Sequence, residues 1–155
     1  DKIISSTYIN ENLEIKTITK KEQEFSYRKS IFQKKDWIII SAKIKLEKGN
    51  KEEIKNKIEE YSKNRKEKQP LNMPSAGSTF KRPEGYFAGK LIEDAGLRGF
   101  RVGDAQVSEK HCGFVINRGN ASAAEVMELM RQVEDKVEEN SGVRLEAEVR
   151  RIGEF

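Results

Sequence analysis

Metal-binding and redox-active side chains are scarce in this sequence. Its 155 residues include a single cysteine, Cys112, and a single histidine, His111. One cysteine cannot form an internal disulfide, and its presence is compatible with a reducing cytoplasm. A zinc site needs more Cys or His ligands than this pair provides, and neighbours on a strand point to opposite faces. We therefore predict neither a zinc site nor a Cys-His nucleophile.

Long apolar runs are also absent. No stretch approaches the roughly 20 apolar residues that cross a bilayer, so we expect no membrane segment. The N-terminal residues lack the charged and apolar regions of a signal peptide, and a strand pattern begins at once at Ile3. These absences and the lone cysteine predict a cytoplasmic protein.

Charged residues, by contrast, are abundant and nearly balanced in sign. They make up 36% of the chain, and 30 Lys+Arg against 26 Asp+Glu give a net charge of +4. Such a mildly basic protein can bind an anionic ligand or nucleic acid. One alternative is therefore a nucleic-acid module that uses the basic residues 63–68, with Tyr27, Phe32 and Phe80 as stacking rings. Another alternative is an inactive fragment.

The order of strand and helix patterns predicts an α+β fold. Residues 3–9 and 13–18 alternate as a hairpin, which needs further strands because two strands alone are not stable. The chain thus looks like a piece of something larger. Residues 37–46 predict a strand whose first half is apolar on both faces and therefore buried, and residues 143–152 predict a last strand.

Helix boundaries are marked by capping residues. Asn50 with Glu53, and Ser122 with Glu125, have the spacing of capping boxes. The first predicts a charged helix that ends near Gln69. The second predicts a helix to about residue 140. A shorter helix is expected over residues 86–95, with Gly96 at its C-terminal end. Gly142 should end the helix that begins at Ser122.

The segment 74–96 is the centre of the functional interpretation. Its first half is small and polar between Pro74 and Pro83, which predicts an ordered loop and no strand. Ser78 lies in this loop near two cations, Lys81 and Arg82, and a helix follows, so a reacting group is plausible here. The alternative is a structural loop whose serines satisfy backbone groups.

Five segments, in order, carry a family resemblance. They are YRKSIF at 27–32, SAGSTFKRP at 75–83, AGKLIEDAGL at 88–97, AQVSEKH at 105–111 and LEAEVRRIG at 145–153. Together they resemble the UDP-N-acetylenolpyruvoylglucosamine reductases, bacterial flavoenzymes of peptidoglycan precursor synthesis. The resemblance implies FAD as cofactor, NADPH as co-substrate and a UDP-sugar enolpyruvate as substrate.

The resemblance also implies a domain organisation. Residues 1–48 correspond to the C-terminal part of the FAD-binding domain, 49–74 to a helix and linker, and 75–155 to the substrate-binding domain. The region that grips the FAD pyrophosphate in the family would precede Asp1. Alone, this chain is therefore expected to bind FAD weakly or not at all.

The family's site residues can be carried over by motif. The resemblance implies that Arg28 stabilises negative charge on the substrate carboxylate, that Ser78 donates a proton and that Glu148 is their acidic partner. Residues expected to bind the substrate are Lys66, Lys68, Lys81 and Arg82. The chain departs from the family at Asp104, where a second glycine is usual, and at Arg82, where many members have Asn.

Overall fold

A computed structural model describes residues 2–153 and mixes helices with strands, which confirms the α+β class. The chain divides into two compact units, Asp1–Ile54 and Lys55–Phe155. No helix in the described range is both long and apolar enough to span a bilayer.

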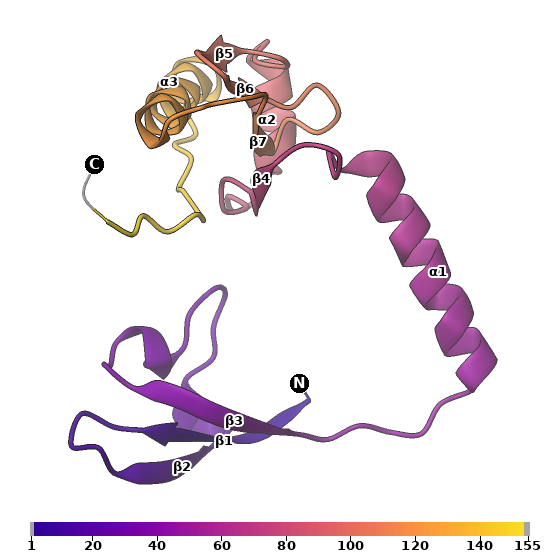
Figure 1. The fold of residues 1–155 in the computed structure, drawn as a ribbon, viewed down its shortest axis with the longest axis vertical. Helices are drawn as coiled ribbons and strands as arrows, with labels where there is room; N and C mark the ends of the chain where they lie inside the picture. The colour runs from indigo at the N-terminus through magenta and orange to yellow at the C-terminus, as the bar shows by residue number, and fades with distance from the viewer. Residues whose placement is uncertain (1, 154–155) are drawn as a thin grey trace. The chain divides into compact units, whose positions relative to one another are not determined.

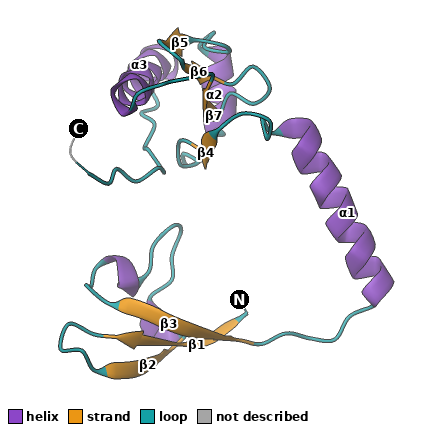
Figure 2. Cartoon of the chain, in the orientation of Figure 1, coloured by secondary structure: helices purple, strands orange, loops and turns teal. Residues whose placement is uncertain are grey.

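The first unit is a three-stranded antiparallel sheet (Figures 1 and 2). Its strands are β1 (Ile3–Ile9), β2 (Ile15–Thr19) and β3 (Ile38–Ile44), in the order β2-β1-β3. The expected hairpin of β1 and β2 is confirmed, and β3 supplies the further strand that it needs. Two short 3-10 turns, η1 (Lys21–Gln23) and η2 (Ile31–Gln33), lie in the connection to β3.

An aromatic cluster joins that connection to the sheet. Tyr8 of β1 is buried and stacks on Trp37, with 4.1 Å between ring centroids. Phe32 of η2 meets the edges of both rings, at 5.8 Å from Tyr8 and 6.1 Å from Trp37. Such ring pairs stabilise a fold by more than the free energy expected from the apolar area that they bury. The segment between η1 and β3 is thus fixed to one face of the sheet.

The expectation that the first half of the third strand is buried is wrong. Ile38, Ile39 and Ile40 are 66%, 52% and 51% exposed. β3 is an edge strand, and no other element among residues 2–153 buries these side chains. The apolar run had indicated burial on both faces, which requires covering elements that the described residues lack.

Helix α1 (Lys51–Lys68) begins where its capping residue predicts. The Asn50 side-chain oxygen accepts hydrogen bonds from the backbone N–H groups of Glu52, at 2.9 Å, and Glu53, at 3.2 Å. The helix is charged on most sides and has no buried residue.

The second unit contains a four-stranded antiparallel sheet in the order β4-β7-β6-β5. Its strands are β4 (Ser75–Ser78), β5 (Arg101–Val102), β6 (Ala105–Val107) and β7 (Phe114–Asn117). Helix α2 (Ala88–Asp94) and helix α3 (Ala123–Ser141) pack against each other, and α3 also contacts β5 and β6. Gly103, at φ +55°, allows the tight turn between β5 and β6.

Helix α3 supplies much of the core of the second unit. Leu129, Met130, Val133 and Val137 are all buried on one face. The capping box is confirmed, because the backbone N–H of Glu125 donates to the Ser122 hydroxyl and the Glu125 carboxylate accepts from the Ser122 N–H. Gly142 ends the helix at φ +70°.

Two further expectations for the second unit are wrong. Ser75–Ser78 forms strand β4 instead of a loop, because it pairs with β7 at Ser75–Ile116 and Ser78–Phe114. Residues 143–152 form no strand; they make only one bridge, between Phe80 and Ala147. Both errors concern pairing with residues far away in the sequence, which local composition does not report.

Candidate functional site

Ser78 lies at the exposed end of β4, on a backbone held by its neighbour. Thr79 is buried; its N–H donates to the Gly113 carbonyl at 2.9 Å, and its hydroxyl accepts from the Val115 N–H at 2.9 Å. The preceding Gly77 has φ +87°, a conformation that side chains disfavour. The hydroxyl of Ser78 is therefore presented from a fixed turn.

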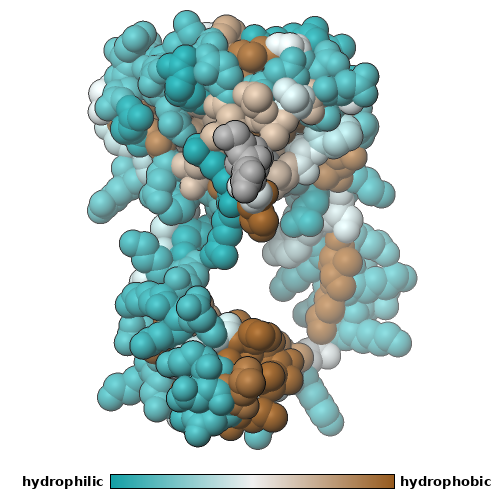
Figure 3. All heavy atoms as spheres, turned by 60° about the vertical axis from the view of Figure 1, so that its left-hand side comes forward, coloured by the Kyte–Doolittle hydropathy of each residue, from teal (hydrophilic) through white to brown (hydrophobic). Residues whose placement is uncertain are grey.

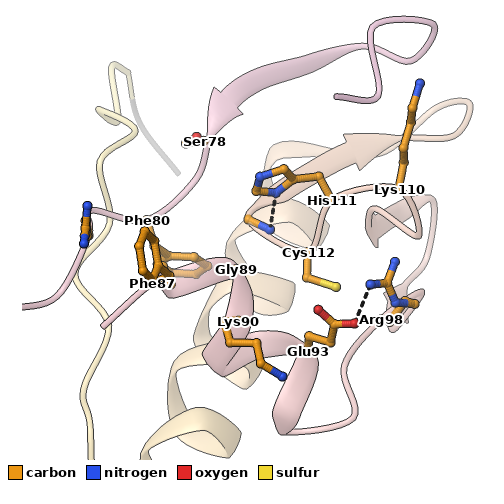
Figure 4. Close-up of a pocket in the computed structure, with 13 residues that line it drawn as sticks. Ser78, Phe80, Phe87, Gly89, Lys90, Glu93, Arg98, Lys110, His111 and Cys112 are labelled. Carbon is orange, nitrogen blue, oxygen red and sulfur yellow. Dashed lines mark hydrogen bonds and ion pairs between the residues drawn. The ribbon is translucent and has the colours of Figure 1, made fainter. Parts of the chain in front are cut away.

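A cavity of about 360 Å³ begins at Ser78 and continues between α2 and the turn before β7 (Figure 4). Four cations line it, Arg82, Lys90, Arg98 and Lys110, against one acid, Glu93. An excess of positive charge in a concave site favours an anionic ligand. Aromatic carbon from Phe80 and Phe87 lines the same cavity.

Close backbone packing shapes the wall of this cavity. A side chain at Gly89 of α2 would begin 3.2 Å from the Gly113 backbone nitrogen and 3.2 Å from the His111 ring. Gly89 thus lets the helix approach the 111–113 turn. Within that turn the Gly113 N–H donates to His111 Nδ1 at 3.0 Å, so a neutral His111 carries its proton on Nε2.

Arg82 lines the cavity and is held in place by two neighbouring residues, Tyr86 and Phe87. Its guanidinium lies over the Phe87 ring, 3.9 Å from the centroid, and its Nε donates to the Tyr86 carbonyl at 3.2 Å. A cation over an aromatic face is attracted to the ring. Arg82 is therefore ordered at the cavity.

The other end of the cavity contains an ion pair and the lone thiol. Arg98 pairs with Glu93 at 2.7 Å and lowers the pKa of that carboxyl below its usual value. Cys112 is buried, and burial raises the pKa of its thiol, although the nearby Arg98 acts in the opposite direction. A thiol with a raised pKa is a poor nucleophile, so Cys112 contributes packing.

The segments that carry Ser78 and Glu148 lie side by side. The Glu148 N–H donates to the carbonyl of Thr79 at 2.9 Å, and the Lys81 N–H donates to the carbonyl of Glu146 at 2.8 Å. The Lys81 ammonium also pairs with the Glu146 carboxylate. The structure thus brings Lys81 and Glu148 to the strand end that bears Ser78, although neither lines the cavity.

Lys66 and Lys68, the other two expected substrate cations, lie in the last turn of α1 and do not line the cavity. A cavity residue reaches that turn, because Lys110 Nζ donates to the Lys66 carbonyl at 2.6 Å. Lys110, Lys90, Arg98 and Phe87 were not predicted as site residues. Lys90 and Lys110 lie in two of the segments that carry the family resemblance, but the four residues come together at the cavity only in the fold.

Arg28 belongs to the first unit and stands at the corner of a tight turn. Ser26 and Lys29 exchange two backbone hydrogen bonds, of 3.0 and 3.2 Å, across Tyr27 and Arg28. Arg28 has φ +57°, and its guanidinium lies 5.7 Å from the centroid of the Tyr27 ring. The turn presents this cation on the surface of the unit.

Comparison with known proteins gives a consistent result. Residues 69–152 match the family described as UDP-N-acetylenolpyruvoylglucosamine reductase, C-terminal domain. A protein of that name from Agathobacter rectalis is 56% identical over 100% of this chain and 49% of its own length. Another from Lachnoclostridium phytofermentans is 58% identical over 99% of this chain and 50% of its own length.

A solved structure agrees with these matches. The crystal structure of UDP-N-acetylenolpyruvylglucosamine reductase from Thermus caldophilus has a TM-score of 0.80 and 35% identity, and it covers 95% of this chain and 52% of its own. The chain therefore spans about half the length of the relatives that it matches.

Proposed function

This chain belongs to the UDP-N-acetylenolpyruvoylglucosamine reductase family, and we propose that it is part of a cytoplasmic enzyme that reduces UDP-N-acetylglucosamine enolpyruvate to UDP-N-acetylmuramate. NADPH is the reductant, FAD is the cofactor, and the product serves peptidoglycan synthesis. The cavity that combines Ser78 with four cations carries the proposal, because a UDP-sugar has a diphosphate. The nucleic-acid alternative is not favoured, since the close relatives are reductases.

The residues described here fit a flavin only in part. One face of the first unit carries a row of isoleucines, Ile9, Ile15 and Ile38, beside a row of hydroxyls from Thr7, Thr17 and Ser41. Such a face suits a flat heteroaromatic ring with polar edges. No glycine-rich phosphate loop occurs in residues 2–153. We propose that the rest of the full-length protein, which in the relatives is about as long as this chain, holds the FAD pyrophosphate.

In this proposal the chain's own side chains stabilise charge and deliver a proton. Flavin, when bound, supplies the hydride that adds to the enolpyruvyl group. Arg28 binds the substrate carboxylate with its guanidinium fork and stabilises the negative charge that develops there. The Ser78 hydroxyl donates a proton to the carbon next to that carboxylate. Glu148 assists from the segment bonded beside Ser78.

The cations have a separate role in this proposal. Arg82, stacked on Phe87 at the cavity, contacts the substrate near Ser78, and Lys81 supports it from the adjacent strand end. Lys66 or Lys68 contacts the substrate diphosphate from the last turn of α1, a turn that the cavity residue Lys110 reaches through its bond to the Lys66 carbonyl.

The test uses the full-length protein with FAD bound. We expect Ser78→Ala to leave flavin reduction by NADPH nearly unchanged and to slow reoxidation by the enolpyruvyl substrate by about 10²-fold, the scale of a lost general acid. Ser75→Ala, on the same strand but outside the cavity, is the control. In the same series, one of the two variants Lys66→Ala and Lys68→Ala should raise KM more than it lowers kcat. Normal reoxidation in Ser78→Ala would remove Ser78 from the mechanism.

A further inference from the structure

The turn that presents Arg28 adopts a conformation that needs support. Arg28 has φ +57°, in the left-handed region that residues other than glycine rarely adopt. Backbone of this kind persists only when surrounding contacts specify it, and it occurs often at functional sites. Two backbone hydrogen bonds between Ser26 and Lys29 close the turn on one side of Arg28. The carbonyl of Arg28 points elsewhere and takes a different partner.

That partner is the side chain of Gln33. Its Nε2 donates to the Arg28 carbonyl at 3.0 Å, and its Oε1 accepts from the Ser30 N–H at 3.0 Å. One planar amide therefore spans the chain from Arg28 to Ser30. The peptide that leaves Arg28 is held in one orientation, since rotating it would break the bond from Nε2.

The amide is itself mounted on the rigid part of the first unit. Gln33 is the last residue of η2, and its N–H donates to the Ser30 carbonyl at 3.2 Å. The preceding residue, Phe32, packs against Tyr8 and Trp37 in the aromatic cluster. Gln33 thus connects the Arg28 turn to the sheet through the side chains of that cluster.

We propose that Gln33 is a positioning residue that fixes the backbone of Arg28, and through it the place from which the guanidinium meets the substrate carboxylate. The inference rests on the proposed function, which gives Arg28 its role. Charge stabilisation depends on geometry, and a displacement of about 1 Å can cost as much as 10²-fold in rate. Glutamine suits the position because it can donate to a carbonyl and accept from an N–H at once, which neither a carboxylate nor an apolar side chain does.

A purely structural role for Gln33 predicts that loss of its side chain lowers the unfolding temperature. We expect the unfolding temperature to change little, because the side chain is exposed and its loss leaves no cavity. A positioning role instead affects only the steps in which Arg28 meets the substrate. Flavin reduction by NADPH and the flavin content of the protein should stay as they are.

The test compares Gln33→Met and Gln33→Glu in the full-length, FAD-loaded protein. Gln33→Met should slow reoxidation by the substrate, or weaken substrate binding to the oxidised protein measured by calorimetry, by about 10-fold. It should also speed hydrogen exchange of the Ser30 amide. The control is Gln132→Met, which removes a bond of a half-buried glutamine, 2.7 Å from Nε2 to Glu128, on α3.

Gln33→Glu adds a pH signature. At neutral pH its carboxylate cannot donate to the Arg28 carbonyl, whereas a protonated carboxyl can. Substrate affinity relative to the parent should therefore recover as pH falls toward the ordinary range of a glutamate, near 4.3. Gln33→Met should show no such recovery, because it has no group to protonate.

A double-mutant cycle with Arg28→Lys separates the possible outcomes. This change keeps the charge and loses the guanidinium fork. If Gln33 acts through Arg28, Gln33→Met should have little further effect in that background. Equal losses in both backgrounds, or Gln33→Met with parental substrate kinetics while Arg28→Lys is impaired, would overturn the positioning role alone. An unimpaired Arg28→Lys protein would refute the proposed role of Arg28 and, with it, this inference.

Discussion

The two units of this chain differ in how they treat apolar surface. In the second unit, α3 buries Leu129, Val133 and Val137 completely against the sheet and α2. In the first unit, isoleucines of β2 and β3 stay exposed, and hydrophobic residues gather in one patch on its surface (Figure 3). Exposed apolar patches of this kind are typical of surfaces that contact a ligand or another segment. The second unit has a core of its own, whereas the first leaves most of its isoleucines exposed.

The largest expected effect follows directly from this contrast. Expressed alone, residues 49–155 should fold and unfold cooperatively, because the segment contains its own core and the capped helix α1. Residues 1–48 alone should not unfold cooperatively. About 50 residues with only one covered sheet face bury too little apolar surface to stabilise a fold. Thermal circular dichroism follows the unfolding of each segment, and binding of a hydrophobic dye reports how much apolar surface each segment leaves exposed. A sharp unfolding transition for residues 1–48 would break the comparison.

The same contrast explains which features the sequence could predict. Capping residues such as Asn50 and Ser122 act on N–H groups two or three residues away, so their helices could be placed from local sequence. The burial of β3 and the pairing of β4 depend on distant partners, and both were predicted wrongly. A run of isoleucines indicates a need for burial but does not say which segment provides it.

The candidate site also contains residues that the sequence could suggest and residues that only the fold brings together. Arg28, Ser78 and Glu148 were proposed by resemblance to a family, and their roles remain predictions. The strand-end contact between Thr79 and Glu148 joins residues almost 70 positions apart in the chain and could not be read from composition. The cations and the aromatic ring of the cavity, Lys110 and Phe87 among them, converge only in the fold.

A smaller effect should separate core from surface at single residues. Leu129→Ala in residues 49–155 should lower the free energy of unfolding by about 2–5 kcal/mol, because the removed side chain is fully buried. Ile39→Ala in the whole chain removes a side chain that is half exposed and should leave the urea midpoint of the Trp37 fluorescence change almost unchanged. Urea denaturation monitored by α3 helicity and by Trp37 fluorescence reports the two units separately. Equal losses would mean that β3 is covered in solution.

The smallest expected effect is electrostatic and lies on the exposed side of α3. Arg131 and Gln132 donate to the Glu128 carboxylate and lower its pKa to about 2. Between that value and the 4.5 of an unperturbed glutamate, the unfolded chain binds more protons than the folded one. The contribution of Glu128 is therefore fully present above pH 4.5 and is lost as the pH falls toward 2.

Glu128→Gln should make the unfolding temperature of residues 49–155 less sensitive to pH over that interval, and Arg131→Gln should do so in part, because it removes the guanidinium while Gln132 still donates. The change should be small beside that of Leu129→Ala, because solvent screens an exposed pair. Thermal unfolding at closely spaced pH values from 2 to 5 measures it. If Glu128→Gln changed the unfolding temperature as much as Leu129→Ala, surface charge would rival the core in stabilising the second unit, and the contrast between the two units would no longer rest on apolar burial.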